Sequence, residues 1–294
     1  MPTINKAAEL LSKGQPVFYV STRELSHSNG LALAHTWADI IRIDFEHEAF
    51  DMAALGEFMQ GLVAGGPTAS GHRTPAVIAE LPTDGTDEAV MRANSWMVKQ
   101  VLAQGVHGIL LCHAETPGAA RVLVEASRYS FQALGVGIQL GKGRRGHGGQ
   151  AKAAAAWGMS ESDYLRRADV WPLNPEGELI LGLKIENPRA LANVEETLAV
   201  PGLGFAEWGP GDMGMALGYP EQHDPPYPQA MRDARERVRK ACLANKVNFL
   251  EMISADSYQR QLEEGVMVCG APNASVAALA RRYAASRASG TSPA

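Results

Sequence analysis

The chain has 294 residues and a formal net charge of -5, with 46% hydrophobic and 20% charged residues. This composition excludes a fully disordered chain, because there is enough apolar surface to form a sizeable core. The apolar runs are far shorter than the roughly 18 residues of a membrane helix, and the acidic balance argues against a nucleic-acid binder. Three cysteines lie far apart and no signal sequence is visible, so we expect a cytoplasmic protein.

Eight short apolar runs alternate with amphipathic stretches along the chain. The predicted strands are 16–20, 40–45, 76–81, 108–112, 179–185, 204–208, 247–250 and 265–269. The predicted helices between them are 51–63, 87–103, 117–127, 188–199, 228–244 and 257–264. Eight strands with intervening helices are typical of an α/β (β/α)8 TIM barrel. The alternative, a doubly wound open sheet, normally has fewer strands and a glycine-rich phosphate turn after the first strand, which this chain does not show.

Several segments refine this expected architecture. Pro188 and Pro228 stand at the start of two predicted helices, where the first turn tolerates proline. A glycine-rich segment, 141–149, opens a long connection before the fifth strand, and connections of that length are usually functional or mobile. We predict a single barrel domain over residues 1–284 and a flexible tail over residues 285–294.

Polar residues collect at the ends of the fifth and sixth predicted strands, where the active sites of TIM barrels lie. With a period of two, Gly182, Lys184 and Glu186 share one face of the fifth strand. Asp212 follows the next strand, after the glycine-rich segment 209–211. Two carboxylates on neighbouring strand ends suggest a hard divalent cation that keeps several waters. The alternatives are an internal Lys184–Glu186 ion pair and a carboxylate that caps the following helix.

The second strand ends in a group of ionisable residues. Arg42, Asp44 and Glu46 share a face, and His47 begins the loop. A histidine beside carboxylates at a barrel mouth is a candidate acid or base. The alternative is a histidine that only donates structural hydrogen bonds.

Two further features give weaker indications. His113 and Glu115 follow the fourth strand, where a solvated loop is the favoured interpretation. Arg145 lies in a basic, glycine-rich loop that suits a carboxylate or phosphate, although an exposed turn or a subunit contact explains it equally well.

Four motifs together resemble the metal-dependent class II 2-keto acid aldolases of the HpcH/HpaI aldolase/citrate lyase family, over roughly residues 15–283. The motifs are Asp44-Phe45-Glu46-His47, Lys184-Ile185-Glu186, Arg145-Gly146-His147-Gly148 and the segment 209–218, which begins Gly209-Pro210-Gly211-Asp212.

The resemblance implies a TIM barrel whose C-terminal helix is exchanged between protomers of a homo-oligomer, a hexamer or trimer of dimers. It implies one divalent cation per chain (Mg²⁺, Mn²⁺ or Co²⁺), bound by Glu186 and Asp212. The cation would chelate a 2-oxo acid and stabilise an enolate, with His47 as acid/base. The other residues implied at the site are Arg145, Gly209, Pro210 and Gly211 for substrate, and Asp44 and Glu46 in support.

The chain departs from the family pattern at the substrate. Glu80 stands where the family has an arginine that points at the keto oxygen, and Lys184 replaces a glutamine. An aspartate that supports the histidine from a neighbouring chain falls near Ala103 here, and an insertion lies around residues 82–92. Reversing the charge at position 80 removes an oxyanion stabiliser, which costs about 3 kcal/mol or more. We therefore expect Glu80 and Lys184 to take part in an altered catalytic site.

The leading hypothesis is a metal-dependent carbon–carbon lyase of the aldolase type, acting on a 2-oxo or hydroxy-oxo acid with an atypical substrate site. A decarboxylase or hydratase of a related oxo acid uses the same metal chemistry on a different bond. A CoA-ester lyase ranks lower, because no adenine or pantetheine site is recognisable. A metal-binding, non-catalytic homologue is the non-enzyme alternative.

Overall fold

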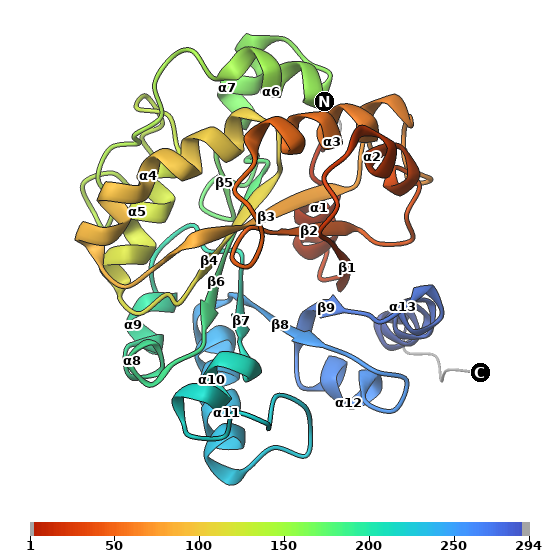
Figure 1. The fold of residues 1–294 in the computed structure, drawn as a ribbon, viewed down its shortest axis with the longest axis vertical. Helices are drawn as coiled ribbons and strands as arrows, with labels where there is room; N and C mark the ends of the chain where they lie inside the picture. The colour runs from red at the N-terminus through yellow and green to blue at the C-terminus, as the bar shows by residue number, and fades with distance from the viewer. Residues whose placement is uncertain (1–2, 290–294) are drawn as a thin grey trace.

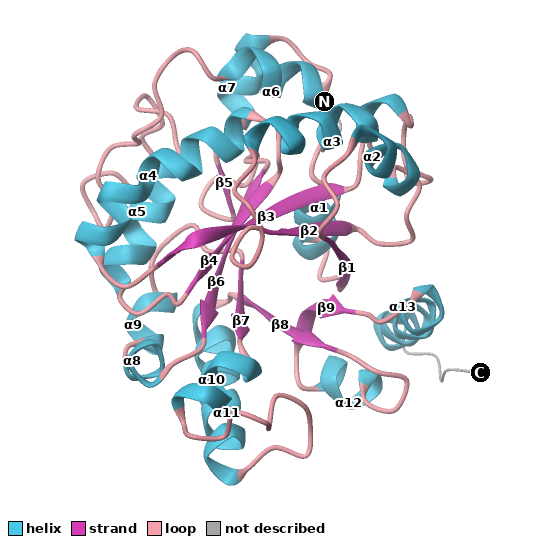
Figure 2. Ribbon diagram, viewed as in Figure 1, coloured by secondary structure: helices cyan, strands magenta, loops and turns pink. Residues whose placement is uncertain are grey.

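The strands form a closed parallel barrel, seen in a computed structural model that describes residues 3–289. The magenta strands occupy the centre of Figure 2 and the cyan helices surround them. The barrel strands are β1 (Val17–Thr22), β2 (Ile40–Asp44), β3 (Ala76–Asp84), β4 (Gly108–Cys112), β6 (Leu179–Ile185), β7 (Phe205–Trp208), β8 (Asn248–Met252) and β9 (Val266–Gly270). Their order follows the chain, and the pairs β1–β9 and β4–β6 close the ring. The predicted TIM barrel is thereby confirmed.

One strand was not predicted. β5 (Val170–Trp171) pairs with β6 in parallel, beside the barrel wall. A two-residue strand carries no alternation of side chains, so the sequence gives no signal for it.

The helices follow the strands around the barrel (Figure 1). They are α1 (Lys6–Ser12), α2 (His27–Leu33), α3 (Met52–Ala64), α4 (Glu88–Ala103), α5 (Pro117–Ser127), α6 (Gln150–Trp157), α7 (Glu161–Arg167), α8 (Pro188–Ala192), α9 (Val194–Leu198), α10 (Pro210–Ala216), α11 (Gln229–Asn245), α12 (Tyr258–Glu263) and α13 (Ala274–Ser289). Four short helices, α2, α6, α7 and α10, were not predicted, because one or two turns carry little periodicity.

Two predicted helices differ from the structure in detail. The single helix expected over 188–199 is two helices, which meet at Asn193. The Asn193 side-chain amide donates hydrogen bonds to the carbonyl oxygens of Glu115 and Arg189, which holds the chain at this break. Pro228 precedes α11 as its N-cap and does not lie within the first turn, whereas Pro188 does begin α8.

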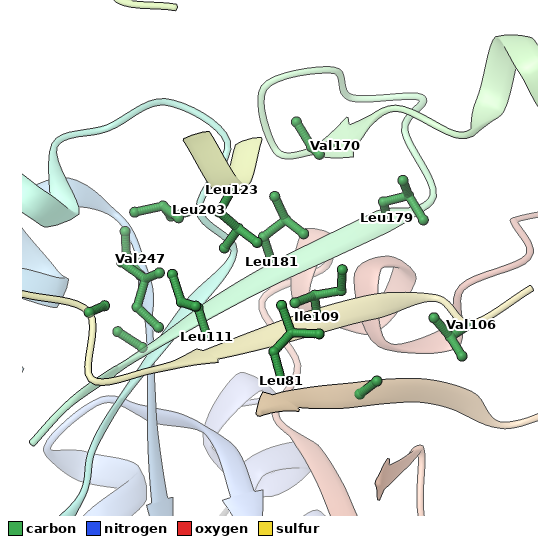
Figure 3. Close-up of a cluster of buried hydrophobic side chains, with 14 of the residues drawn as sticks. Leu81, Val106, Ile109, Leu111, Leu123, Val170, Leu179, Leu181, Leu203 and Val247 are labelled. Carbon is green, nitrogen blue, oxygen red and sulfur yellow. The ribbon is translucent and has the colours of Figure 1, made fainter. Parts of the chain in front are cut away.

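The core has two parts, separated by the barrel wall. Side chains that point into the barrel include Ile40, Ile78, Leu110 and Phe205, and they fill its floor. Side chains of opposite parity pack outward against the helices. Figure 3 shows this outer layer, in which Leu181 lies close to Leu123 and the neighbouring strands carry Ile109, Leu111 and Leu81. Because an apolar floor closes the barrel, polar groups on the inner face gather above it, at the carboxyl ends of the strands.

Side-chain N-caps fix where several helices begin after the strands. Asp51, Asp87, Thr116 and Asn187 each accept a hydrogen bond from a backbone N–H in the first turn of α3, α4, α5 and α8 respectively. Each such cap contributes about 1 kcal/mol. The caps therefore define the loops that carry the polar residues of the barrel mouth.

The last helix packs against its own barrel in this chain. Arg281 of α13 lies 2.7 Å from an Asp39 carboxylate oxygen, and its guanidinium stacks 4.5 Å from the centre of the Phe18 ring. The exchange of this helix between protomers stays a prediction. α13 runs to Ser289, so the helix extends beyond the predicted domain boundary at residue 284, and the rest of the expected tail lies outside the described residues.

None of the helices within residues 3–289 combines the length and the apolar character that crossing a bilayer requires.

Candidate metal centre

Four ionisable side chains converge at the barrel mouth. Glu46, His113, Glu186 and Asp212 each offer a ligand atom, and these atoms all lie within 4.8 Å of one another. They follow β2, β4, β6 and β7, so the closure of the barrel brings them together. Three carboxylates and one imidazole form an oxygen-rich donor set, which suits a hard divalent cation.

Glu186 is the most enclosed member of this group. Its side chain is 0% exposed, and the backbone N–H of His113 donates to Oε1 at 2.7 Å. Oε2 is buried and accepts no hydrogen bond from the described residues. A Cβ at Gly209 would lie 2.4 Å from Oε2, so only glycine leaves room for this carboxylate. A buried oxygen that accepts no hydrogen bond and has the Lys184 ammonium 3.2 Å away, in a space kept open by glycine, fits a cation ligand.

The electrostatic setting of Glu186 supports the same assignment. Burial raises the pKa of Glu186 to about 7, against the opposing effects of Lys184 and His113. A divalent cation bound beside this buried carboxyl group would lower its pKa again, because the cation stabilises the ionised form.

Asp212 joins the candidate site from the first turn of α10. Its side chain is partly exposed, and no hydrogen bond or ion pair to it is found among residues 3–289. The predicted neighbourhood of Glu186 and Asp212 is therefore present, with Gly209 between them in the sequence and in contact with Glu186.

His113 belongs to the cluster, although the sequence favoured a solvated loop for it. Its ring nitrogens lie 3.6 Å from carboxylate oxygens of Glu46 and Glu186. Its φ of 44° is in the left-handed region, which costs about 1 kcal/mol or more for a residue other than glycine. Glu115 instead pairs with Arg189 at 2.9 Å. The position of His113 directly after a barrel strand was the signal available in the sequence.

Lys184 lies beside the cluster and contacts three carboxylates. Its Nζ is 2.6 Å from Glu46 Oε2, 3.1 Å from Glu80 Oε1 and 3.2 Å from Glu186 Oε2. Burial lowers the pKa of Lys184, but Glu186 and the other acidic neighbours outweigh burial and raise it above its usual range. The Lys184–Glu186 contact expected as one alternative exists, as part of a larger network.

Glu80 faces into the barrel, as its strand parity predicts. Besides Lys184, it has Arg42 as a neighbour, with Nε 3.3 Å from Oε2. Arg42 in turn places Nη1 3.2 Å from Glu207 Oε2 on β7. Burial raises the pKa of Glu80, and the charges of Arg42 and Lys184 oppose that rise. The sequence analysis did not identify Glu207 as a residue of the site. The only signal for it was its position two residues before Gly209, at the end of a predicted strand.

His47 stands at the rim, outside the four-residue cluster. Its Nδ1 lies 3.1 Å from Asp44 Oδ2, and its backbone N–H donates to Asp44 Oδ1 at 3.0 Å. Burial raises the pKa of Asp44, but these contacts with His47 lower it overall. The His47 side chain is 60% exposed, and its Nδ1 is 3.8 Å from Glu46 Oε2. Asp44 therefore orients the imidazole, while Glu46 links it to the cluster.

Arg145 is placed elsewhere. Its guanidinium is buried, stacks 4.2 Å from the Tyr129 ring centre and donates to the Tyr164 hydroxyl at 2.8 Å. That hydroxyl donates to the carbonyl of Leu102, where α4 leads into the beginning of β4. This is the end of the barrel opposite to the cluster, so within one chain Arg145 does not line the candidate site. The glycine-rich loop packs against α7, and its course depends on that packing.

Comparison with known proteins supports one family. A family model described as HpcH/HpaI aldolase/citrate lyase matches residues 75–269. The 2-keto-3-deoxy-L-rhamnonate aldolase of Escherichia coli O157:H7 is 29% identical over 169 residues, covering 58% of this chain and 56% of that protein. The chain thus spans about half the length of the curated relatives it matches.

Solved structures give the same fold. An HpcH/HpaI aldolase/citrate lyase family protein from Burkholderia cenocepacia J2315 superposes with a TM-score of 0.70 at 22% identity, covering 98% of this chain and 100% of that chain. Macrophomate synthase gives 0.64 at 20% identity, covering 98% and 89%. At these identities the two structures support the fold alone. Since the family model covers most of the barrel, including the strand ends that carry Glu186 and Asp212, the chain belongs to the HpcH/HpaI aldolase/citrate lyase family.

Proposed function

We propose that this protein is a divalent-metal-dependent carbon–carbon lyase of the aldolase type, acting on a 2-oxo or hydroxy-oxo acid. The observation that carries the proposal is the convergence of Glu46, His113, Glu186 and Asp212 within 4.8 Å at the barrel mouth. Family membership and the name of the Escherichia coli relatives, 2-keto-3-deoxy-L-rhamnonate aldolase, favour aldol cleavage over decarboxylation or hydration. No contact in the described site favours either alternative.

Glu186 and Asp212 would hold the cation, with His113 and Glu46 next to them. When bound, Mg²⁺, Mn²⁺ or Co²⁺ supplies a Lewis acid for the negative charge that develops on a 2-oxo acid during cleavage. Gly209 leaves space beside the Glu186 oxygen, and Pro210 and Gly211 lead directly into Asp212 in the first turn of α10, which supports the assignment of Asp212 as the second ligand.

His47 and Asp44 would move the proton. Nδ1 is held by Asp44, so the neutral imidazole carries its proton there and leaves Nε2 as an acceptor. Cleavage of a 4-hydroxy-2-oxo acid requires removal of the hydroxyl proton, and we propose that Nε2 accepts it, since the His47 side chain is 60% exposed at the barrel mouth. Asp44 then stabilises the resulting imidazolium.

The carboxylate of Glu80 distinguishes this site from the family pattern, which has an arginine at this position. A carboxylate close to the reacting oxo acid opposes negative charge there, and the nearby ammonium of Lys184 offsets that effect. We therefore propose that the substrate is other than pyruvate with a simple aldehyde partner.

The proposal is tested by metal titration and cleavage assays. Chelator-stripped protein should bind one Mn²⁺ per chain in calorimetry, and it should cleave at least one member of a panel of 4-hydroxy-2-oxo acids that differ in the 2-oxo acid they release, with both products identified by mass spectrometry. Asp212→Ala should lose both properties. A protein that binds one Mn²⁺ but cleaves no panel member would be a non-catalytic homologue, whereas unchanged Mn²⁺ binding in Asp212→Ala would reject the ligand assignment.

We also propose a cytoplasmic homo-oligomer. Cys112, Cys242 and Cys269 are buried free thiols, which fits a reducing compartment. The oligomer proposal rests on the family resemblance, with α13 as the element expected to contact a neighbouring protomer.

A further inference from the structure

A second group of potential cation ligands lies directly beside the candidate metal centre. Glu46, Glu80 and Cys112 offer ligand atoms within 4.8 Å of one another, and Glu46 belongs to both groups. The ammonium group of Lys184 already lies between the carboxylates of this second group. Lys184 Nζ lies 2.6 Å from the Glu46 carboxylate and 3.1 Å from that of Glu80.

Lys184 also reaches into the first group. Its third contact, at 3.2 Å, is Glu186 Oε2, the buried oxygen that accepts no hydrogen bond among the described residues. The lysine side chain is only 8% exposed, so water screens these contacts little. Arg42 holds Glu80 from the other side, at 3.3 Å. One ammonium thus bridges the two groups of ligands.

We propose that Lys184 is a tethered second cation, which occupies the position that a second metal ion would otherwise take and limits the centre to one divalent ion per chain. The inference rests on the proposed metal-dependent function and adds a role for Lys184 to it. The lysine is a positioning residue in this scheme: it sets how tightly the neighbouring ion binds, and its contacts hold the carboxylates of Glu46 and Glu80 in place.

Charge balance leads to the same conclusion. When a cation is bound and Glu46, Glu80, Glu186 and Asp212 are all ionised, they bring four negative charges, while Lys184 and one divalent ion bring three positive charges. Arg42, which also contacts Glu80, is offset by its other partner, Glu207. Replacing Lys184 with a neutral side chain leaves two negative charges unmatched beside the first ion. Buried charges without partners are strongly unfavourable, so the site then attracts a further cation.

The alternative role for Lys184 is an amine that forms an imine with the oxo acid. That chemistry needs a neutral amine, and three carboxylate contacts within 3.2 Å favour the ammonium. Treatment of the wild-type protein with pyruvate and borohydride should leave its mass unchanged. A mass increase located on Lys184 would overturn the proposal.

The central experiment compares wild type with Lys184→Met on chelator-stripped protein, by calorimetry and by electron paramagnetic resonance with Mn²⁺. We expect one Mn²⁺ per wild-type chain. In Lys184→Met we expect a second Mn²⁺ and a first ion bound at least about tenfold more tightly, because a like charge is removed from its side. One Mn²⁺ per chain, with an affinity within twofold of wild type, would overturn the proposal.

Two further variants keep the result interpretable. Lys184→Met with Glu80→Gln removes one charge of each sign, so it should fold even if the single variant does not, and it should return to one Mn²⁺ per chain. Two ions in this double variant contradict the proposal. Lys152→Met, at an exposed lysine on α6, is the matched control and should bind like wild type. If wild type binds no Mn²⁺, the proposed function itself fails, which separates the two hypotheses.

Discussion

At the scale of single residues, the main feature of the barrel mouth is a set of buried, charged side chains. Glu80 and Glu186 are almost fully buried, and their carboxylates depend on Lys184 and Arg42 for compensation. Removing one partner of such a network costs about 3–5 kcal/mol, because the other charge stays buried. Burying these charged groups lowers the stability of the protein, and they all lie at one end of the barrel. This combination indicates a functional site.

His47 should be needed for turnover and not for metal binding. His47→Ala removes the group that accepts the substrate proton, and we expect kcat to fall by about 10²–10⁴-fold. Mn²⁺ affinity should change little, because His47 lies outside the four-residue cluster. Calorimetry and cleavage assays on the same preparation check both statements. A variant with near-wild-type kcat would show that the Asp44–His47 contact is only structural.

Glu80 should separate this protein from ordinary pyruvate aldolases. We expect weak or absent condensation of pyruvate with simple aldehydes in the wild type, since the carboxylate opposes a developing enolate. Glu80→Gln, which keeps the volume and removes the charge, should raise that side activity.

Glu80→Arg adds a stability effect to the same comparison. It would place a third cation against Lys184 and Arg42, and we expect it to lower the free energy of unfolding by several kcal/mol. Brisk wild-type condensation that is abolished in Glu80→Arg would show that Glu80 does not separate this protein from ordinary pyruvate aldolases.

At the scale of elements, the alternation of side chains along the strands places the site. Ile40 and Arg42 share a face of β2, as do Ile78 and Glu80 on β3, so each strand supplies apolar residues to the floor and charged residues to the mouth. The N-caps that begin α3, α4, α5 and α8 then define the short loops around the site.

The turn between β7 and α10 should be sensitive to a single methyl group. Gly209→Ala puts a Cβ 2.4 Å from Glu186 Oε2, so the carboxylate has to move. We expect a loss of about 1–3 kcal/mol in stability and at least tenfold weaker Mn²⁺ binding. Thermal unfolding and calorimetry measure the two effects.

Gly211→Ala is the control for this substitution. A Cβ at Gly211 meets no atom within 4 Å, so the variant should bind Mn²⁺ like wild type. Equal affinities in wild type and Gly209→Ala would show that the turn does not position Glu186.

At the scale of the whole molecule, closure of the barrel creates the centre. The candidate ligands come from segments as far apart in sequence as residues 46 and 212, and the consecutive pairing of β2, β3, β4, β6 and β7 brings these strand ends together. The apolar floor below and the helices outside hold this ring of strand ends in place.

The assembly can be checked independently of activity. Light scattering coupled to gel filtration should give six times the mass of one chain, as the family resemblance implies. Deleting α13, from Ala274 onward, should abolish that assembly if the helix joins protomers. A wild-type protein that elutes as a monomer would reject the oligomer proposal.

The sequence alone determined the eight barrel strands and the places of Glu186, Asp212 and Glu80, because side chains on a strand alternate with a period of two and parallel strands end on the same side. The position of His47 beside carboxylates at a strand end made it a candidate acid or base, and that role stays a prediction. The tertiary structure decided the position of His113, which depends on a left-handed backbone after β4, and the partners of Glu207. It also placed Arg145 at the opposite end of the barrel. Local periodicity fixes where strand side chains point, whereas the course of a loop depends on the elements it packs against, and those contacts exist only once the barrel has closed.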